Sequence, residues 1–209
     1  MTANVVVLDY GSGNLRSAQR ALEAAGATVT VTPDLGLAER ADGLVVPGVG
    51  AYAACMAGID QVQAAPVIAE RVMAGRPVLG ICVGAQIMFE AGDEHGVVTK
   101  GLGLLPGSVT RLAARRVPHM GWNLVDAPAG SRLFTGIDAD ARCYFVHSYA
   151  AVPTAELDAV AVVTTSTHEQ ATFVAAAERG SLSVAQFHPE KSGAVGAALL
   201  RNWVEGLAS

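Results

Sequence analysis

The motif Gly80-Ile81-Cys82-Val83-Gly84 places a thiol between two glycines, at the junction of two apolar runs. This G-x-C-x-G pattern has the form of a nucleophile elbow with cysteine in place of serine. Small neighbours allow a tight strand-to-helix turn, which lifts the central side chain to the carboxyl end of a sheet. A helix N-terminus at that point favours the thiolate and offers N–H groups to an oxyanion. A buried core cysteine is the other interpretation, and for the motif alone it is about equally good.

A candidate general base lies in the stretch QFHPEKS, residues 186–192. His188 follows an apolar strand-like run, and Glu190 stands two residues further on. In extended backbone, residues i and i+2 point the same way, and Pro189 fixes the intervening φ angle. Glu190 can therefore orient the His188 imidazole, as in a Cys–His–Glu triad with Cys82. The alternative is a loop histidine beside a solvated glutamate.

A third candidate is the stretch PGVGAY, residues 47–52, which directly follows an apolar run. Glycines on both sides of Val49 allow a peptide unit to rotate, so that an N–H faces a developing oxyanion. By itself the pattern also fits an ordinary strand-to-helix turn.

The elements that must position these motifs alternate in the first half of the chain. Apolar runs predict strands, and amphipathic runs predict helices. The first helix is expected to have Asn14 as its N-cap and to end at Gly26. Pro66 is expected to interrupt the second helical region. The strands are expected at 4–9, 27–32, 43–47 and 76–81, and the helices at 14–26, between 52 and 75, and at 85–90.

Short strands separated by turn residues fill most of the second half, which indicates antiparallel additions. They are expected at 108–112, 121–125, 141–150, 158–165, 171–178 and 182–187, before a last helix at 193–207. The prediction is therefore an α/β fold: a flavodoxin-like, open, mostly parallel sheet with helices on both faces and antiparallel strands in the second half. Residues 1–209 are expected to form one domain.

Composition excludes several classes of protein. The chain has 209 residues, is 51% hydrophobic and carries a net charge of −5, so no basic surface for nucleic acid or membrane is expected. No signal peptide or membrane span is expected either. The odd count of three cysteines, without C-x-x-C spacing, argues against disulfides and structural metal and favours the cytoplasm. Cys55 and Cys143 are interpreted as packing residues.

Together and in this order, PGVG, GICVGAQ and FHPE resemble the class I, or triad, glutamine amidotransferases. The stretches DYGSGNLRSA (9–18), VPHMGWN (117–123), YFVHSY (144–149) and HPEKS (188–192) are similar to the glutaminase subunits of imidazole glycerol phosphate synthases. The resemblance implies that Cys82 attacks the glutamine amide to form a thioester, with His188 as base and Glu190 as its orienter. It implies no cofactor.

The resemblance also implies roles for residues outside the triad. Val49, Gly50 and Val83 would form the oxyanion hole, and the glutamine contacts would be Gln86, Glu94, His147, Ser148 and Tyr149. Ammonia would pass to a separate (β/α)8 cyclase subunit in a heterodimer. The residues facing that partner or an ammonia gate would be Pro118, Met120, Trp122, Asn123, Tyr144 and Lys191.

Alternatives remain at this point. A glutaminase for an anthranilate- or guanylate-type synthase would share the triad, although those branches carry PHMGWN and YFVHSY in different form. A cysteine hydrolase on a related fold would place histidine directly after the nucleophile, where this chain has Val83. A non-catalytic flavodoxin-like module would leave Cys82 unreactive. NAD binding is rejected because GSGNLR has Arg16 at the third glycine position.

Overall fold

The computed structural model describes residues 2–208. Its central seven-stranded sheet has the order β11-β12-β13-β4-β3-β1-β2. Five neighbouring strands are parallel, and two antiparallel strands extend one edge, which confirms the predicted fold class. The parallel strands are β1 (Asn4–Leu8), β2 (Thr28–Thr32), β3 (Gly43–Gly48), β4 (Val78–Cys82) and β13 (Leu182–Ala185); the antiparallel strands are β11 (Val162–His168) and β12 (Ala171–Arg179).

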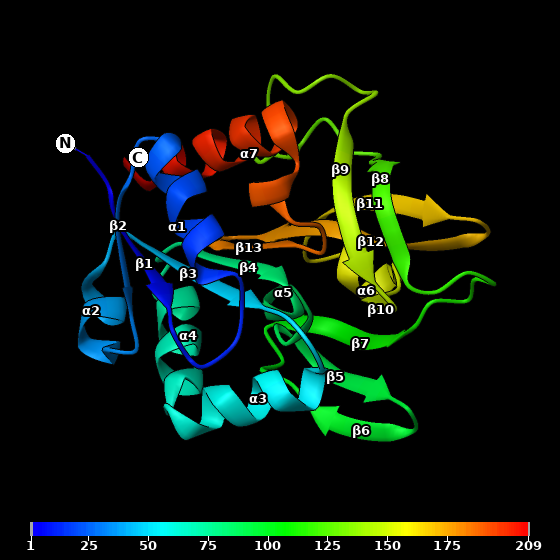
Figure 1. Ribbon diagram of the computed structural model, residues 1–209, viewed down its shortest axis with the longest axis horizontal. Coiled ribbons are helices and arrows are strands. Elements are labelled where there is room, and N and C mark those ends of the chain that lie inside the picture. The colour runs from blue at the N-terminus through cyan, green and yellow to red at the C-terminus, as the bar shows by residue number, and fades with distance from the viewer. Residues whose placement is uncertain (1, 209) are drawn as a thin grey trace.

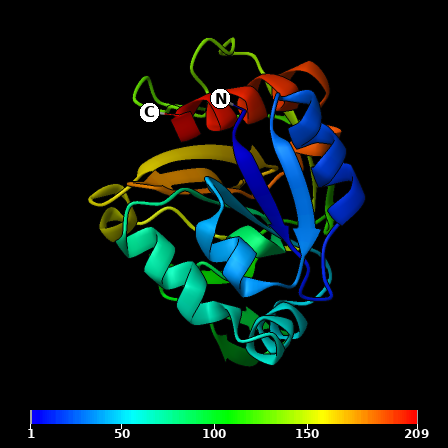
Figure 2. The same ribbon diagram turned by 90° about the vertical axis from the view of Figure 1, so that its left-hand side faces the viewer.

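Helices cover both faces of this sheet, as Figures 1 and 2 show. One face carries α1 (Leu15–Ala24) and α7 (Gly193–Glu205), and the other carries α2 (Leu35–Arg40), α3 (Tyr52–Gln61) and α4 (Ala64–Met73). Strands β3 and β4 are buried along their whole length, which explains their continuous apolar sequence. The carboxyl ends of β3, β4 and β13 therefore lie side by side, next to the second half of the chain.

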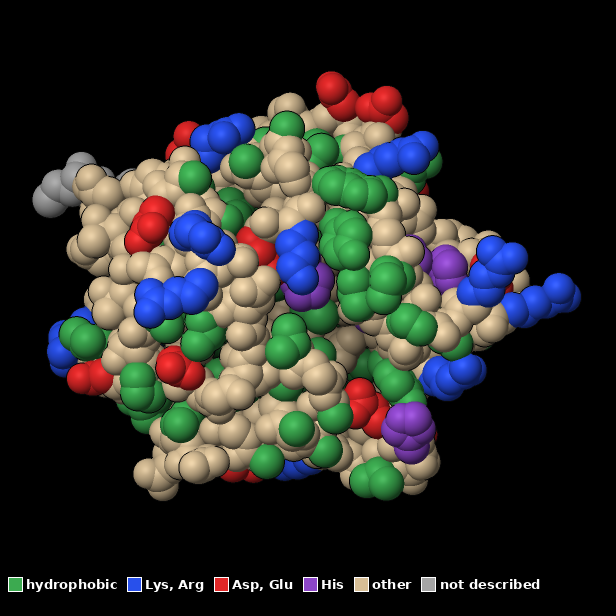
Figure 3. All heavy atoms as spheres, viewed as in Figure 1, with side chains coloured by type: hydrophobic (Ala, Val, Ile, Leu, Met, Phe, Trp, Pro, Cys, Tyr) green, Lys and Arg blue, Asp and Glu red, His purple; other side chains and the backbone are tan. Residues whose placement is uncertain are grey.

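Two smaller sheets lie at that end. One contains β5 (Phe89–Glu94), β6 (Val97–Lys100), β7 (Leu105–Arg111) and β10 (Tyr149–Ala151). The other pairs β8 (His119–Leu124) with β9 (Arg142–His147). On the surface, hydrophobic side chains gather over this β8–β9 region, above a hollow (Figure 3). The short elements are α5 (Val83–Gln86), α6 (Ala155–Asp158), η1 (Pro189–Lys191) and η2 (Gly206–Ala208).

Several predicted boundaries are wrong. The helix expected at 85–90 is a single turn that ends at Gln86, because the chain from Phe89 onward pairs with β7 and β6. The helical break lies at Gln63, with φ of 57°, and not at Pro66, which the first turn of α4 tolerates. The strand expected at 158–165 begins only at Val162.

The predicted C-terminal end of α1 agrees with the structure, whereas the N-terminal end agrees only in part. Gly26 ends the helix region with φ of +100°, as predicted for a glycine stop. Asn14 occupies the predicted N-cap position, where its carbonyl accepts the Ala18 N–H at 3.0 Å, but its side chain makes no capping hydrogen bond.

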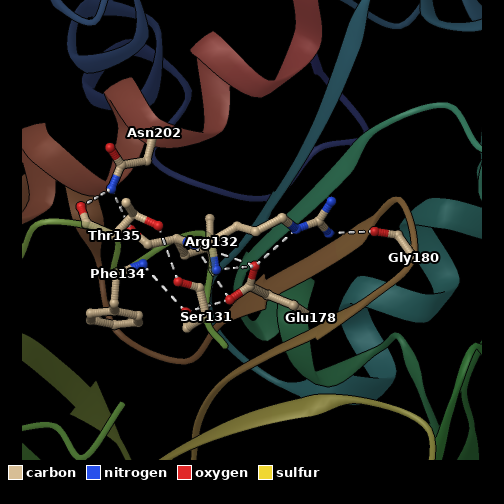
Figure 4. A network of polar contacts seen from close by, with 8 residues as sticks. Ser131, Arg132, Phe134, Thr135, Glu178, Gly180 and Asn202 are labelled. Atoms are coloured by element: carbon tan, nitrogen blue, oxygen red, sulfur yellow. Dashed lines mark hydrogen bonds and ion pairs between the residues drawn. The ribbon is translucent and has the colours of Figure 1, made fainter. Parts of the chain in front are cut away.

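A carboxylate on β12 anchors the long connection between β8 and β9 (Figure 4). Glu178 is buried and accepts hydrogen bonds from the Ser131 hydroxyl and from the Arg132 backbone N–H, the latter at 3.1 Å. From α7, Asn202 Nδ2 donates to the carbonyls of Leu133 and Thr135 at 2.9 and 2.8 Å. This connection is thereby fixed to β12 and α7.

Candidate active site

The nucleophile turn is strained, as a reactive elbow requires. Cys82 ends β4 with φ of +56° and ψ of −116°, a backbone conformation that a non-glycine residue rarely adopts. A Cβ on Gly84 would lie 1.9 Å from the Val46 carbonyl oxygen, and one on Gly80 would lie 2.7 Å from the Gly84 oxygen. Both positions therefore require glycine, so that β3 and the chain after Cys82 can approach this closely.

His188 and Glu190 form a buried pair behind the thiol. His188 Nδ1 lies 2.8 Å from Glu190 Oε1, and the two side chains are only 5% and 2% exposed. Burial lowers the pKa of His188, but hydrogen bonds to Cys82 and Glu190 outweigh it and raise this pKa to about 9. The imidazole is thus protonated at neutral pH and supplies a cation beside Cys82.

This cation changes the explanation for thiol activation. A helix dipole was expected to favour the thiolate, but α5 has only four residues and a macrodipole grows with aligned peptide units. The adjacent imidazolium provides the stronger stabilisation of negative charge on sulfur.

The backbone of His188 is fixed by Ser192, a residue that was given no role in the predicted site. Ser192 Oγ donates to the His188 carbonyl at 2.7 Å and accepts the Tyr144 N–H at 2.9 Å. The His188 N–H donates in turn to the Tyr144 carbonyl at 3.0 Å. Ser192 therefore attaches the histidine to β9, and its place in HPEKS was the only signal that could have identified it.

The PGVG turn lies across from the nucleophile, and the N–H of its central residue, Val49, is already hydrogen-bonded. The Val49 N–H donates to Ser12 Oγ at 3.0 Å, and the same hydroxyl lies 2.9 Å from the Val49 carbonyl oxygen. Cys55 Sγ donates to that carbonyl at 3.4 Å, and Tyr10 donates its hydroxyl to Pro47 at 2.5 Å. In this orientation the Val49 N–H is not available to an oxyanion.

The nucleophile Cys82, the base His188 and the PGVG turn all line one cavity of about 210 Å³. Every residue expected for the oxyanion hole or for glutamine contact lines it, together with Cys82, His188 and Lys191. Val146 also lines it, and its place directly before His147 in YFVHSY was the only sequence signal for that. Glu190 does not line the cavity, which suits a residue that acts through His188.

Two of the expected glutamine contacts also support the surrounding structure. Gln86 Nε2 donates to the Tyr149 carbonyl at 2.8 Å and to Gln186 Oε1 at 3.0 Å, so the side chain is held firmly. Glu94 Oε2 accepts the Tyr52 N–H at 2.9 Å and thereby caps the start of α3, directly after the PGVG turn. The Glu94 carboxylate is thus fixed at the edge of the cavity.

The expected partner-facing residues do not all share one face. Met120 and Trp122 project from β8 and are 63% and 53% exposed, and Trp122 packs edge-on against Tyr144. Pro118 and Lys191 are also exposed. Asn123 lies on the opposite face of β8, where its amide reaches the Thr167 carbonyl at 2.9 Å.

Among residues 2–208 there is no cluster of side chains suited to hold a metal ion. Within the same range, no helix is long and apolar enough to cross a membrane. Cys55, Cys82 and Cys143 are all free and buried.

The raised pKa of His188 gives a titration prediction. A histidine in an unfolded chain titrates near pH 6.5, so protonated His188 stabilises the folded state. That stabilisation is complete below about pH 6.5 and is lost as the pH rises through about 9. We expect the His188 C2–H NMR signal to titrate near pH 9 and Glu190→Gln to lower that midpoint. A midpoint near 6.5 in the unmutated chain would contradict the pairing.

Comparison with known proteins places this site in a family. The sequence matches the glutamine amidotransferase class-I family over residues 6–206. It is 62% identical to the imidazole glycerol phosphate synthase subunit HisH of Mycobacterium tuberculosis, over 99% of this chain and 100% of the relative. The Streptomyces avermitilis HisH subunit is 58% identical over 96% of this chain and 95% of the relative.

Solved structures show the same fold at lower identity. PurLQS from Thermotoga maritima has a TM-score of 0.76 at 19% identity, over 99% of this chain and 100% of that one. A glutamine amidotransferase from the same organism has a TM-score of 0.68 at 16% identity, over 100% of this chain and 99% of that one. The chain therefore belongs to the class-I glutamine amidotransferases and, among them, to the HisH subunits of imidazole glycerol phosphate synthase.

Proposed function

We propose that this chain is the glutaminase subunit of an imidazole glycerol phosphate synthase in histidine biosynthesis. It hydrolyses glutamine and passes ammonia to a (β/α)8 cyclase subunit, which makes imidazole glycerol phosphate and aminoimidazole carboxamide ribotide. One observation carries the proposal: Cys82 and His188 face a single cavity, with Glu190 behind the histidine, in a chain 62% identical to a HisH subunit. The three free cysteines suit the reducing cytoplasm, where we place this reaction.

The geometry gives each triad residue a step. The Cys82 sulfur attacks the side-chain amide carbon of glutamine and forms a tetrahedral oxyanion. His188 then gives its proton to the departing nitrogen, so ammonia leaves and a glutamyl thioester remains on Cys82. The now neutral His188 accepts a proton from water, which attacks the thioester and releases glutamate. Glu190 holds the ring through Nδ1.

The walls of the cavity suit an amino acid with an amide side chain. Glu94 offers a fixed carboxylate for an α-ammonium group, and Gln86 and the backbone of 147–149 offer polar contacts. At the other end, the Val83 N–H and a rotated PGVG turn would stabilise the oxyanion. Because the Val49 N–H is bound to Ser12, that hole is incomplete in this conformation.

The partner would bind the exposed face of β8 and its surroundings. Met120, Trp122 and Leu124 are all large, apolar and about half or more exposed, and an open groove of about 580 Å³ adjoins Trp122. Aromatic and methionine side chains are enriched in protein interfaces, whereas such a patch is costly on an unassembled chain. This surface lies beside His188 because Ser192 joins β9 to the catalytic histidine.

Introducing a charged side chain on this surface tests whether the cyclase binds there. We expect Trp122→Glu to weaken binding of the cyclase by at least about 30-fold, since buried aromatic anchors contribute roughly 2 kcal/mol or more. Titration calorimetry with the purified cyclase measures this. Met73→Glu is a matched control, because Met73 is 76% exposed but lies on α4, away from β8. Equal affinities for both variants would exclude this surface.

A further inference from the structure

A row of neutral polar groups runs from β8 to the wall of the glutamine cavity. Asn123 Nδ2 lies 3.3 Å from His119 Nε2, and His119 Nδ1 lies 3.0 Å from His147 Nε2. His147 Nδ1 then lies 3.0 Å from the Tyr149 carbonyl oxygen. Both imidazoles are buried, and neither is needed for the triad chemistry described above.

The chemistry of the two ends fixes the direction of every hydrogen bond. A carbonyl oxygen only accepts, so His147 must carry its proton on Nδ1, and its Nε2 is an acceptor in the neutral ring. His119 must therefore donate from Nδ1, which leaves its Nε2 to accept from Asn123. The Asn123 amide is consistent with this, because its Nδ2 also donates to the Thr167 carbonyl and its Oδ1 accepts the Leu124 N–H.

Burial keeps both rings in this neutral form. It lowers the pKa of His147 to about 3 and that of His119 to about 4. For His147 the hydrogen bond to the Tyr149 carbonyl raises the pKa, but burial outweighs it, and charge on the ring of His168 lowers the pKa of both rings further. At neutral pH the two imidazoles therefore act as fixed donors and acceptors, not as proton carriers.

The row ends on a group that shapes the cavity. The Tyr149 carbonyl accepts from His147 Nδ1 and also from Gln86 Nε2 at 2.8 Å. His147, Tyr149 and Gln86 all line the cavity. If one hydrogen bond of this row reversed or lengthened, the Tyr149 carbonyl and Gln86, and with them the cavity wall that contacts the amino acid, would therefore shift.

We propose that His119 and Asn123 are positioning residues for glutamine: the directed row Asn123→His119→His147→Tyr149 holds the cavity wall in its binding geometry. The inference rests on the proposed function and adds a route from β8, whose other face carries Trp122, to the substrate site. Neither residue touches the substrate. Their effect is on the affinity for glutamine and not on the chemical step.

The tautomers give a first test that needs no activity. In the full chain labelled with ¹⁵N-histidine, long-range ¹H–¹⁵N correlation spectra at pH 7 should show His119 and His147 as neutral rings protonated at Nδ1. A proton on Nε2 of either ring, or a charged imidazolium, would overturn the row. Because this readout is independent of turnover, it also separates failure of this inference from failure of the glutaminase assignment.

Kinetics with the cyclase present give the second test. His119→Phe keeps the ring stacking but removes both nitrogens, and we expect KM for glutamine to rise about fivefold, the effect of one lost hydrogen bond, with kcat within about twofold. His119→Asn keeps a donor at the Nδ1 position and should restore KM to within about twofold.

The control is His168→Phe, which retains the stacked ring on His119 and lies outside the row. It should leave KM unchanged. Equal KM values in His119→Phe and the unmutated chain, or equal impairment in His119→Phe and His119→Asn, would overturn the proposal.

Discussion

Replacing Cys82 by alanine is expected to lower glutamate release in the assembled synthase by at least about 10⁴-fold, since removal of a covalent nucleophile has effects of this order. No other side chain in the cavity can form the thioester, because the remaining cysteines lie elsewhere in the core. Release of glutamate from glutamine, measured with the cyclase and its nucleotide ligand present, gives the rate. Retained activity would refute the assigned nucleophile.

Cys143→Ala is the matched control for this prediction. Cys143 is buried in β9, and burial raises the pKa of its thiol to about 12, so it stays a thiol at neutral pH. We expect this variant to keep its glutaminase activity and to lose only some stability. A glutamine-like electrophile should label Cys82 in the control but nothing in Cys82→Ala.

The same experiment separates the competing functions. A cysteine peptidase on a related fold would turn over peptide and spare glutamine, whereas a non-catalytic module would leave Cys82 unlabelled. An anthranilate- or guanylate-type glutaminase would respond to a different synthase. The likeness to PurLQS is at 19% identity and speaks for the fold, whereas the Mycobacterium tuberculosis HisH subunit is 62% identical.

The sequence was most informative where a local steric or spacing rule decides the structure. The glycines around Cys82 are required by contacts of 1.9 and 2.7 Å that any side chain would make, so the elbow could be recognised from the motif. The pairing of His188 with Glu190 was also predicted, but the extended backbone expected between them is wrong: only His188 is extended, and Glu190 lies in the 3-10 turn η1, which brings its carboxylate back to the ring. Alternating apolar runs also sufficed to predict the parallel sheet.

Prediction failed where distant segments decide. The run after Gln86 looked helical, but its pairing with β7 and β6 draws it into a sheet. Ser12 contacts Val49 across 37 residues of sequence, and nothing in GSGNLR indicates that partner. The neutral forms of His119 and His147 result from burial among the surrounding strands, which no short motif reports.

Ser12 leads to the second large prediction, which concerns the isolated chain. In this conformation the Val49 N–H donates to the Ser12 hydroxyl, so the oxyanion hole lacks one of its hydrogen-bond donors. Loss of one such donor slows acyl transfer by about 10²–10³-fold. We therefore expect glutamine hydrolysis by the chain alone to be slower by about that factor than in the complex with cyclase and its ligand.

Ser12→Ala should shift this balance in the isolated chain. It removes the acceptor that competes for the Val49 N–H, and one hydrogen bond of ordinary net strength corresponds to about a fivefold change in population. The basal rate of glutamate release should rise by about that factor, while the rate in the complex, where the turn has already rotated, should change little. Ser17→Ala in α1 is the control and should alter neither rate. If Ser12→Ala leaves the basal rate unchanged, the hydroxyl does not restrain the turn; if the isolated chain is already fully active, the Val49 peptide needs no rotation.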